Sequence, residues 1–181
     1  MDKIPHFDTS QSYGFISKFI HFVFIILFLP QIVFGFLLHI LPKSIKSLGY
    51  MSHKALGVLL LWMLVIRVIN LGVQSDRPKP IAVKYLRSYV PKLHSILYLS
   101  MLAMPISGWI MSSIADKPPY VPMIGEWVFP VPHHKSLGAF MHELHHIFAY
   151  ITSAALSLHL LHFIVMRFGK GVRIGSRMFK F

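Results

Sequence analysis

The stretch HHIFAYITSAALSLH, residues 145–159, places a histidine at each end of an apolar run. A step of fourteen residues turns an α-helix through about 1400°, within roughly 40° of whole turns, and advances it by about 21 Å. His145 and His159 are therefore expected on one face of a helix, one near each side of a membrane. An ionisable side chain inside hydrocarbon needs a partner and is by default a functional residue. Two such positions stacked across a membrane indicate electron transfer.

The composition is that of a membrane protein. Hydrophobic residues make up 55% of the 181-residue chain and charged residues only 13%, which lies outside the range of soluble globular domains. At about 20 residues a span, this length supplies four spans with short connections. We expect a single all-α integral-membrane domain over residues 1–181, a bundle of four transmembrane helices. Their expected positions are about 17–41, 51–72, 93–114 and 142–166.

The basic residues predict the orientation of this bundle. The formal net charge is +12, and the lysines and arginines lie mainly between the apolar segments. Thirteen of them fall on one expected side of the membrane and five on the other. The positive-inside rule then places both termini in the cytoplasm. We expect a multi-pass protein of the bacterial inner (cytoplasmic) membrane. The charge is a topology signal, so no nucleic-acid partner is expected. The first apolar segment lacks a small-residue cleavage site and is predicted to be a retained helix.

Cysteine usage limits the cofactors that the chain can hold. The sequence has no cysteine, which excludes disulfides, thiolate metal sites, iron–sulfur clusters and covalently attached haem. A metal must therefore rest on nitrogen or oxygen ligands. Any haem would be non-covalent, of the b type.

Four histidines fall into two pairs at matching depths. With both termini inside, His21 and His159 lie near the cytoplasmic face, and His53 and His145 near the periplasmic face. Two neutral imidazoles can clamp one planar macrocycle axially, as in six-coordinate electron-transfer haems. Zinc suits the pattern less, because pairs about 20 Å apart cannot form one tetrahedral site. A lone membrane histidine is often only an interhelical hydrogen-bonding group, and the matched depths favour metal ligation.

Four segments resemble the helices of the prokaryotic cytochrome b561 family. They are YGFISKFIHFV (13–23), SHKALGVLLLWMLVIRV (52–68), LHSILYLSMLAMPISGW (93–109) and HHIFAYITSAALSLH (145–159). The resemblance extends over residues 13–178. It implies two non-covalent haem b groups in a four-helix bundle. Carried over, it implies that His21 and His159 ligate the cytoplasmic-side haem iron, and that His53 and His145 ligate the periplasmic-side one.

The fourth segment leaves one alternative open. Family members often open this helix with a His–Glu pair that supplies the ligand, and His142–Glu143 has that appearance. The residue fourteen positions after His142 is Leu156, whereas His145 keeps the spacing to His159. We therefore expect His145 to be the ligand, with His142 as the alternative.

Two further side chains are predicted to contact a cofactor. Arg67 lies fourteen residues after His53, so it shares that face at the opposite membrane boundary. It is expected to pair with a haem propionate, the alternative being positive-inside anchoring. His94 opens the third segment on the cytoplasmic side. The resemblance favours contact with a propionate or a quinone carbonyl, the alternative being a snorkelling interfacial side chain.

The resemblance implies an oxidoreductase that passes electrons between a periplasmic donor and membrane quinone. Superoxide is one proposed donor within the family, and a basic periplasmic surface would attract such an anion. The expected partners are membrane lipid, quinone, and a small periplasmic reductant or redox protein. One alternative is a haem-b membrane anchor subunit of a larger hydrogenase- or formate-dehydrogenase-like complex, and the short periplasmic loops favour the stand-alone protein. Another alternative is a non-redox transporter, which would lack haem absorption.

Overall fold

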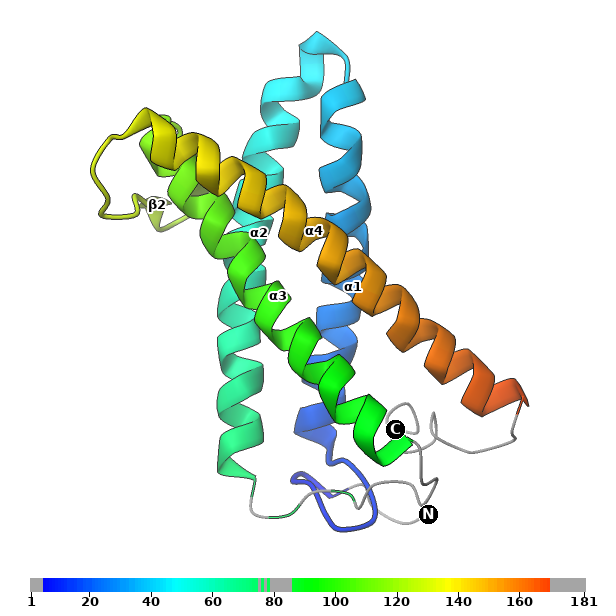
Figure 1. Cartoon of the computed structure of the whole chain (residues 1–181). Helices are drawn as coiled ribbons and strands as arrows, with labels where there is room; N and C mark the ends of the chain where they lie inside the picture. Colours follow the sequence, from blue (N-terminus) through cyan, green and yellow to red (C-terminus); the bar gives the residue numbers. More distant parts are fainter. Residues whose placement is uncertain (1–4, 75, 77, 79–85, 170–181) are drawn as a thin grey trace.

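Four long helices run antiparallel to form the molecule (Figure 1). The computed structural model describes residues 5–74, 76, 78 and 86–169. The helices are α1 (Phe15–Leu37), α2 (Lys43–Val73), α3 (Leu86–Ile114) and α4 (Lys135–Ile164). A 3-10 turn, η1 (Leu38–Ile40), follows α1, and a π turn, η2 (Val165–Gly169), ends α4. Two short strands, β1 (Tyr120–Val121) and β2 (Gly125–Glu126), pair antiparallel between α3 and α4.

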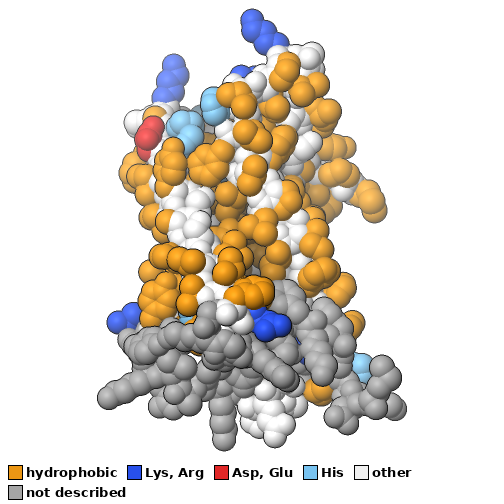
Figure 2. All heavy atoms as spheres, turned by 90° about the vertical axis from the view of Figure 1, so that its right-hand side faces the viewer, with side chains coloured by type: hydrophobic (Ala, Val, Ile, Leu, Met, Phe, Trp, Pro, Cys, Tyr) orange, Lys and Arg blue, Asp and Glu red, His pale blue; other side chains and the backbone are white. Residues whose placement is uncertain are grey.

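Each of the four helices is long and apolar enough to cross a membrane, and the chain is a multi-pass membrane protein. Large hydrophobic side chains are exposed along all four helices. Figure 2 shows such side chains over the middle of one face, with lysine and arginine side chains toward its two ends. In water such a surface would drive association, whereas in a bilayer lipid covers it.

The helices form two hairpins that cross each other at an angle (Figure 1). α1 packs on α2, α3 packs most extensively on α4, and α2 also contacts α3. A buried core of Phe24, Phe28, Leu60 and Leu64 joins α1 to α2 near mid-height, and Leu156 of α4 packs against it. We call the end with the α1–α2 and α3–α4 connections the loop end, and the end where α1 begins and α4 ends the terminal end.

Three helices begin well before the predicted positions. The expected starts at 51, 93 and 142 are wrong, because α2, α3 and α4 begin at Lys43, Leu86 and Lys135. The apolar pattern marks the part of a helix that lipid surrounds. Backbone hydrogen bonding continues the helix through polar turns beyond it. Pro42 helps at α2, because its φ of −55° is already close to helical at the N-cap position. The predicted first helix, 17–41, corresponds to α1 with η1, and the predicted fourth, 142–166, ends inside η2.

Tryptophans hold the α3–α4 connection against the bundle. Trp109 of α3 donates its indole N–H to the backbone oxygen of Trp127 at 2.6 Å. The Trp127 ring lies 5.5 Å from that of Trp109 and 5.6 Å from that of Trp62 on α2, measured between centroids. Trp127 N–H donates to the Pro119 carbonyl at 2.9 Å, which closes the β1–β2 turn. The connection is therefore packed on α2 and α3.

We expect Trp109→Phe to lower the free energy of unfolding by about 1 kcal/mol, because it removes the indole donor and keeps an aromatic ring. Thermal unfolding in detergent measures the change, and limited proteolysis reports loosening of residues 115–134. Trp62→Phe is the control, because it keeps a ring against Trp127. Identical melting of the Trp109 variant and the native protein would contradict the assigned role of this hydrogen bond.

Candidate functional site

Two imidazoles from different helices meet at the loop end of the bundle. The rings of His53 on α2 and His145 on α4 lie 6.3 Å apart between centroids, at an interplanar angle of 89°. Both side chains are half-buried. Two metal–nitrogen bonds of about 2 Å each, from imidazoles on opposite sides of one ion, place ring centroids about 6 Å apart. The separation of His53 and His145 therefore fits axial ligation of a single iron.

A hydrogen bond fixes the tautomer of His145. Its Nδ1 lies 2.7 Å from the backbone oxygen of Met104 on α3. A carbonyl oxygen can only accept, so Nδ1 carries the hydrogen and Nε2 keeps its lone pair. Metal-ligating histidines are commonly oriented in this way. His145 thus has a nitrogen prepared for a metal and a backbone group that holds the ring.

Glycines on the other two helices make room for these rings. A Cβ added at Gly35 of α1 would lie 2.9 Å from Cε1 of His53. One added at Gly108 of α3 would lie 2.9 Å from both Cε1 and Nδ1 of His145. Real Cβ atoms do not approach this closely without displacing the ring. All four helices therefore contribute to the placement of the His53–His145 pair.

A second group of polar side chains lies toward the terminal end. We call it the Arg67 cluster: His21 (α1), Arg67 (α2), His94 and Tyr98 (α3), and His159 (α4). Arg67, His94 and His159 come within electrostatic reach of His21, and the rings of His94 and His159 lie 5.1 Å apart between centroids. Arg67 Nε donates to the Tyr98 hydroxyl at 2.9 Å. The structure thus brings the predicted residues His21 and His159 into one cluster with Arg67 and His94.

The two histidine sites lie on one face of α4. His145, Thr152 and His159 are spaced by seven residues, or nearly two turns. Thr152 is fully buried, and Ala155 beside this face is buried as well. Tyr150 and Leu161 are exposed. The face that carries the histidines is therefore the face that packs into the bundle.

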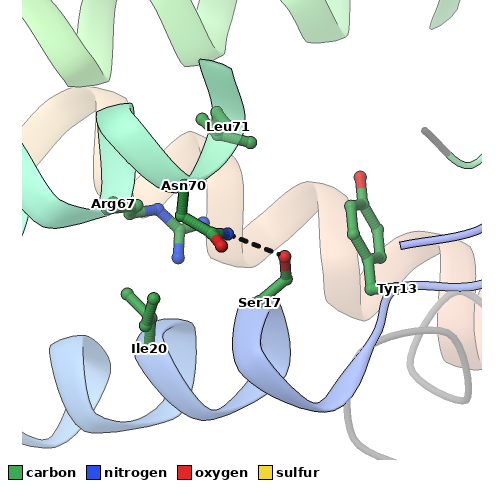
Figure 3. A pocket seen from close by; sticks show the side chains of 6 residues that line it. All are labelled: Tyr13, Ser17, Ile20, Arg67, Asn70 and Leu71. Atoms are coloured by element: carbon green, nitrogen blue, oxygen red, sulfur yellow. Dashed lines mark hydrogen bonds between the residues drawn. The ribbon is translucent and has the colours of Figure 1, made fainter. Parts of the chain in front are cut away.

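A small pocket adjoins the Arg67 cluster (Figure 3). It is lined by Tyr13, Ser17, Ile20, Arg67, Asn70 and Leu71. Asn70 Nδ2 donates to Ser17 Oγ at 2.9 Å across the α1–α2 contact. The cavity volume of about 20 Å³ suits one water molecule. It is too small for a quinone ring, and Ser17, Arg67 and Asn70 supply polar groups to a lining that is otherwise mostly apolar.

His142 lies apart from both groups. Its side chain is 55% exposed and lies 3.6 Å from Glu143, and its ring packs on His146 at 4.6 Å between centroids. The ring that meets His53 belongs to His145. The geometry thus favours the fourteen-residue spacing over the His–Glu appearance of residues 142–143.

Three contacts of the histidine sites escaped sequence reasoning. The Met104 carbonyl gives no side-chain signal, because any residue can supply a backbone oxygen. The edge-on contact of His94 with His159 depends on how α3 crosses α4. Gln31 of α1 is 4% exposed and donates from Nε2 to the His53 carbonyl at 2.7 Å. Its only signal in the sequence is that it is an amide within a long apolar run.

The donor set suits haem better than a bare metal ion. Within residues 5–74 and 86–169, no group of three or more histidine, aspartate and glutamate side chains could hold such an ion. Two facing imidazoles are sufficient for a macrocycle that supplies its own four in-plane nitrogens. Four apolar helices with paired internal imidazoles define a membrane cytochrome of the b type.

The comparisons with known proteins agree with this class. The family model described as prokaryotic cytochrome b561 matches residues 12–181. The chain therefore belongs to the prokaryotic cytochrome b561 family, a family of redox-active membrane cytochromes. Membership implies b-type haem and electron transfer. The comparison with curated proteins found no match to this chain.

We expect Gly108→Ala to weaken haem binding, because the new Cβ would displace the His145 ring from the Met104 carbonyl. Loss of such a supporting contact typically costs about 10- to 100-fold in metal affinity. The haem-to-protein ratio of purified protein measures the effect. Gly72→Ala is the matched control, because a Cβ at Gly72 meets nothing within 4 Å. Equal haem retention in both variants would show that Gly108 does not constrain the site.

Proposed function

We propose that the chain holds two b haems, one at each end of the bundle, and passes electrons across the membrane between them. The axial ligands in this proposal are His53 and His145 at the loop end, and His21 and His159 at the terminal end. The ring separation of His53 and His145, 6.3 Å, is the observation that carries the proposal. Bound haem supplies reversible one-electron chemistry at its iron.

The spacing of the two histidines on α4 sets the distance between the two proposed haems. His145 and His159 are about 21 Å apart along α4, and the shorter gap between macrocycle edges is within electron-transfer range. The buried segment between them is apolar apart from small hydroxyl side chains such as Thr152.

Arg67 is the group best placed to neutralise a propionate at the terminal end. Its Nε is occupied by the Tyr98 hydroxyl, and its guanidinium also borders the pocket with Ser17 and Asn70 (Figure 3). A guanidinium pairs with a carboxylate through two parallel hydrogen bonds. The rings of His94 and His159 meet edge-on with centroids 5.1 Å apart, which is too short for both rings to ligate one iron. We therefore assign His94 a propionate or quinone contact and not ligation.

The proposed orientation places the loop end in the periplasm and both termini in the cytoplasm, following the positive-inside rule. Lys54, next to His53, donates from Nζ to the Lys117 carbonyl at 2.8 Å, which holds a cation at the loop end. A small anion such as superoxide is attracted by a basic surface. Two superoxide ions would each give up one electron to become dioxygen. Quinone would accept both electrons with two protons from the cytoplasmic side.

We expect His53→Ala and His145→Ala each to lose the loop-end haem and keep the terminal-end haem. His21→Ala and His159→Ala are each expected to lose the terminal-end haem and keep the loop-end haem. An alanine removes one of two axial ligands and opens a cavity beside the iron. Haem-to-protein ratios and reduced-minus-oxidised spectra measure the loss. His142→Ala is the control, because its ring is exposed and lies against His146 and Glu143. Haem loss in that variant with full retention in His145→Ala would reverse the assignment.

We expect purified protein to be reduced by superoxide within the mixing time of a stopped-flow experiment and reoxidised by added ubiquinone analogue. The α-band absorbance follows both steps. Raising the ionic strength should slow the first step, because salt screens attraction between an anion and the loop-end lysines. Reduction only by a docked redox protein would instead favour the membrane anchor function. Failure of quinone to reoxidise the protein would remove quinone as acceptor.

A further inference from the structure

Gln31 is a buried amide that reaches from α1 to the helix that carries His53. It follows Pro30 and is 4% exposed in the middle of a membrane span. Its Nε2 donates to the backbone carbonyl of His53 at 2.7 Å. Gly57, one turn further along α2, lies beside the amide, and a Cβ there would be in ordinary contact with Nε2 at 3.6 Å. One half of the amide is therefore anchored on the residue that carries the imidazole.

The other half of the amide has no partner. Gln31 Oε1 is buried without a hydrogen-bond partner among the described residues, and so is Nδ1 of the His53 ring. Burying such groups unpaired costs free energy, so native structures almost always pair them. One of these atoms is an acceptor. The other, on a neutral imidazole, is a donor when it carries the ring hydrogen.

The two unpaired atoms belong to the same contact between α1 and α2. Gly35 is one turn after Gln31 on α1, and the His53 ring lies against Gly35. The Gln31 amide touches the backbone of the same histidine. The contrast with the partner ring is direct, since Nδ1 of His145 has the Met104 carbonyl at 2.7 Å. His53 has no backbone carbonyl in that role.

We propose that Gln31 is the positioning residue for His53: the two side chains do not bond each other in this structure, and a small reorientation would let Oε1 accept the Nδ1–H of the imidazole. This inference rests on the proposed function, in which His53 is an axial ligand of the loop-end haem. The pairing fixes the His53 tautomer with the Nε2 lone pair toward the iron. It also lets a side chain of α1 set the electron density of the ligand. A hydrogen-bonded imidazole donates more strongly and stabilises the oxidised iron.

The test is the midpoint potential of the loop-end haem, with the ferric electron paramagnetic resonance spectrum as a second readout. Gln31→Leu removes the acceptor at similar volume, so the potential is expected to rise. Gln31→Glu keeps an acceptor oxygen, so the potential is expected to stay at or below the native value. If Gln31 acts through its hydrogen bond to the ligand, the midpoint potential rises in Gln31→Leu and does not rise in Gln31→Glu. Loss of packing alone would shift the potential of both variants in the same direction.

Gln74→Leu is the matched control, since it removes a buried amide that bonds Asn70 and Asp8 away from His53. It is expected to leave the loop-end potential unchanged. An unchanged potential and spectrum in Gln31→Leu, with the haem retained, would overturn the role of Gln31. Should Gln31→Leu fail to fold, a Gln31→Glu potential above the native one would overturn it. The loop-end haem is identified by its loss in His53→Ala, so retention of both haems there would refute the proposed function instead.

Discussion

Imidazole rings in an apolar interior must find their partners within the protein, and the bundle is arranged around that requirement. No water is available at membrane depth to satisfy a ring nitrogen. Nδ1 of His145 therefore bonds a carbonyl of α3, and its ring occupies space that Gly108 leaves open. The crossing of the two hairpins brings His53 of α2 against it. A different crossing angle would separate the rings even if every helix kept its length.

The histidines at the two ends of the bundle are surrounded by different kinds of groups. At the loop end, glycines and backbone oxygens constrain the positions of the rings, and the Lys54 cation lies next to His53. At the terminal end, Arg67 adds a fixed cation that bonds the Tyr98 hydroxyl and borders a pocket lined also by the Asn70 amide. The first environment suits simple passage of an electron. The second suits a place where propionates, protons and a polar substrate meet, which matches the proposed positions of donor and acceptor.

Sequence reasoning reached the helices and the shared face of His145 and His159, because hydropathy and helical periodicity are local properties. The matching depths of His53 and His145 followed from span order alone. The early start of α2 at Lys43 could not be predicted, since lysine-bearing turns carry no apolar signal. The role suggested for Gln31 was equally hidden. It depends on which residue of α2 faces it, and that is set by packing between helices distant in sequence.

His145, Thr152 and His159 are spaced by seven residues on α4. This spacing fixes both the distance between the two histidine sites and their relative orientation. Inserting one residue between the two histidines would rotate His159 by about 100° out of the Arg67 cluster while His145 stayed in place. An insertion of four residues, about one turn, would return both rings to one face, but it would move them about 6 Å further apart. Variation in length is therefore confined to the connections, and the spacing within α4 is the dimension against which the other three helices are fitted.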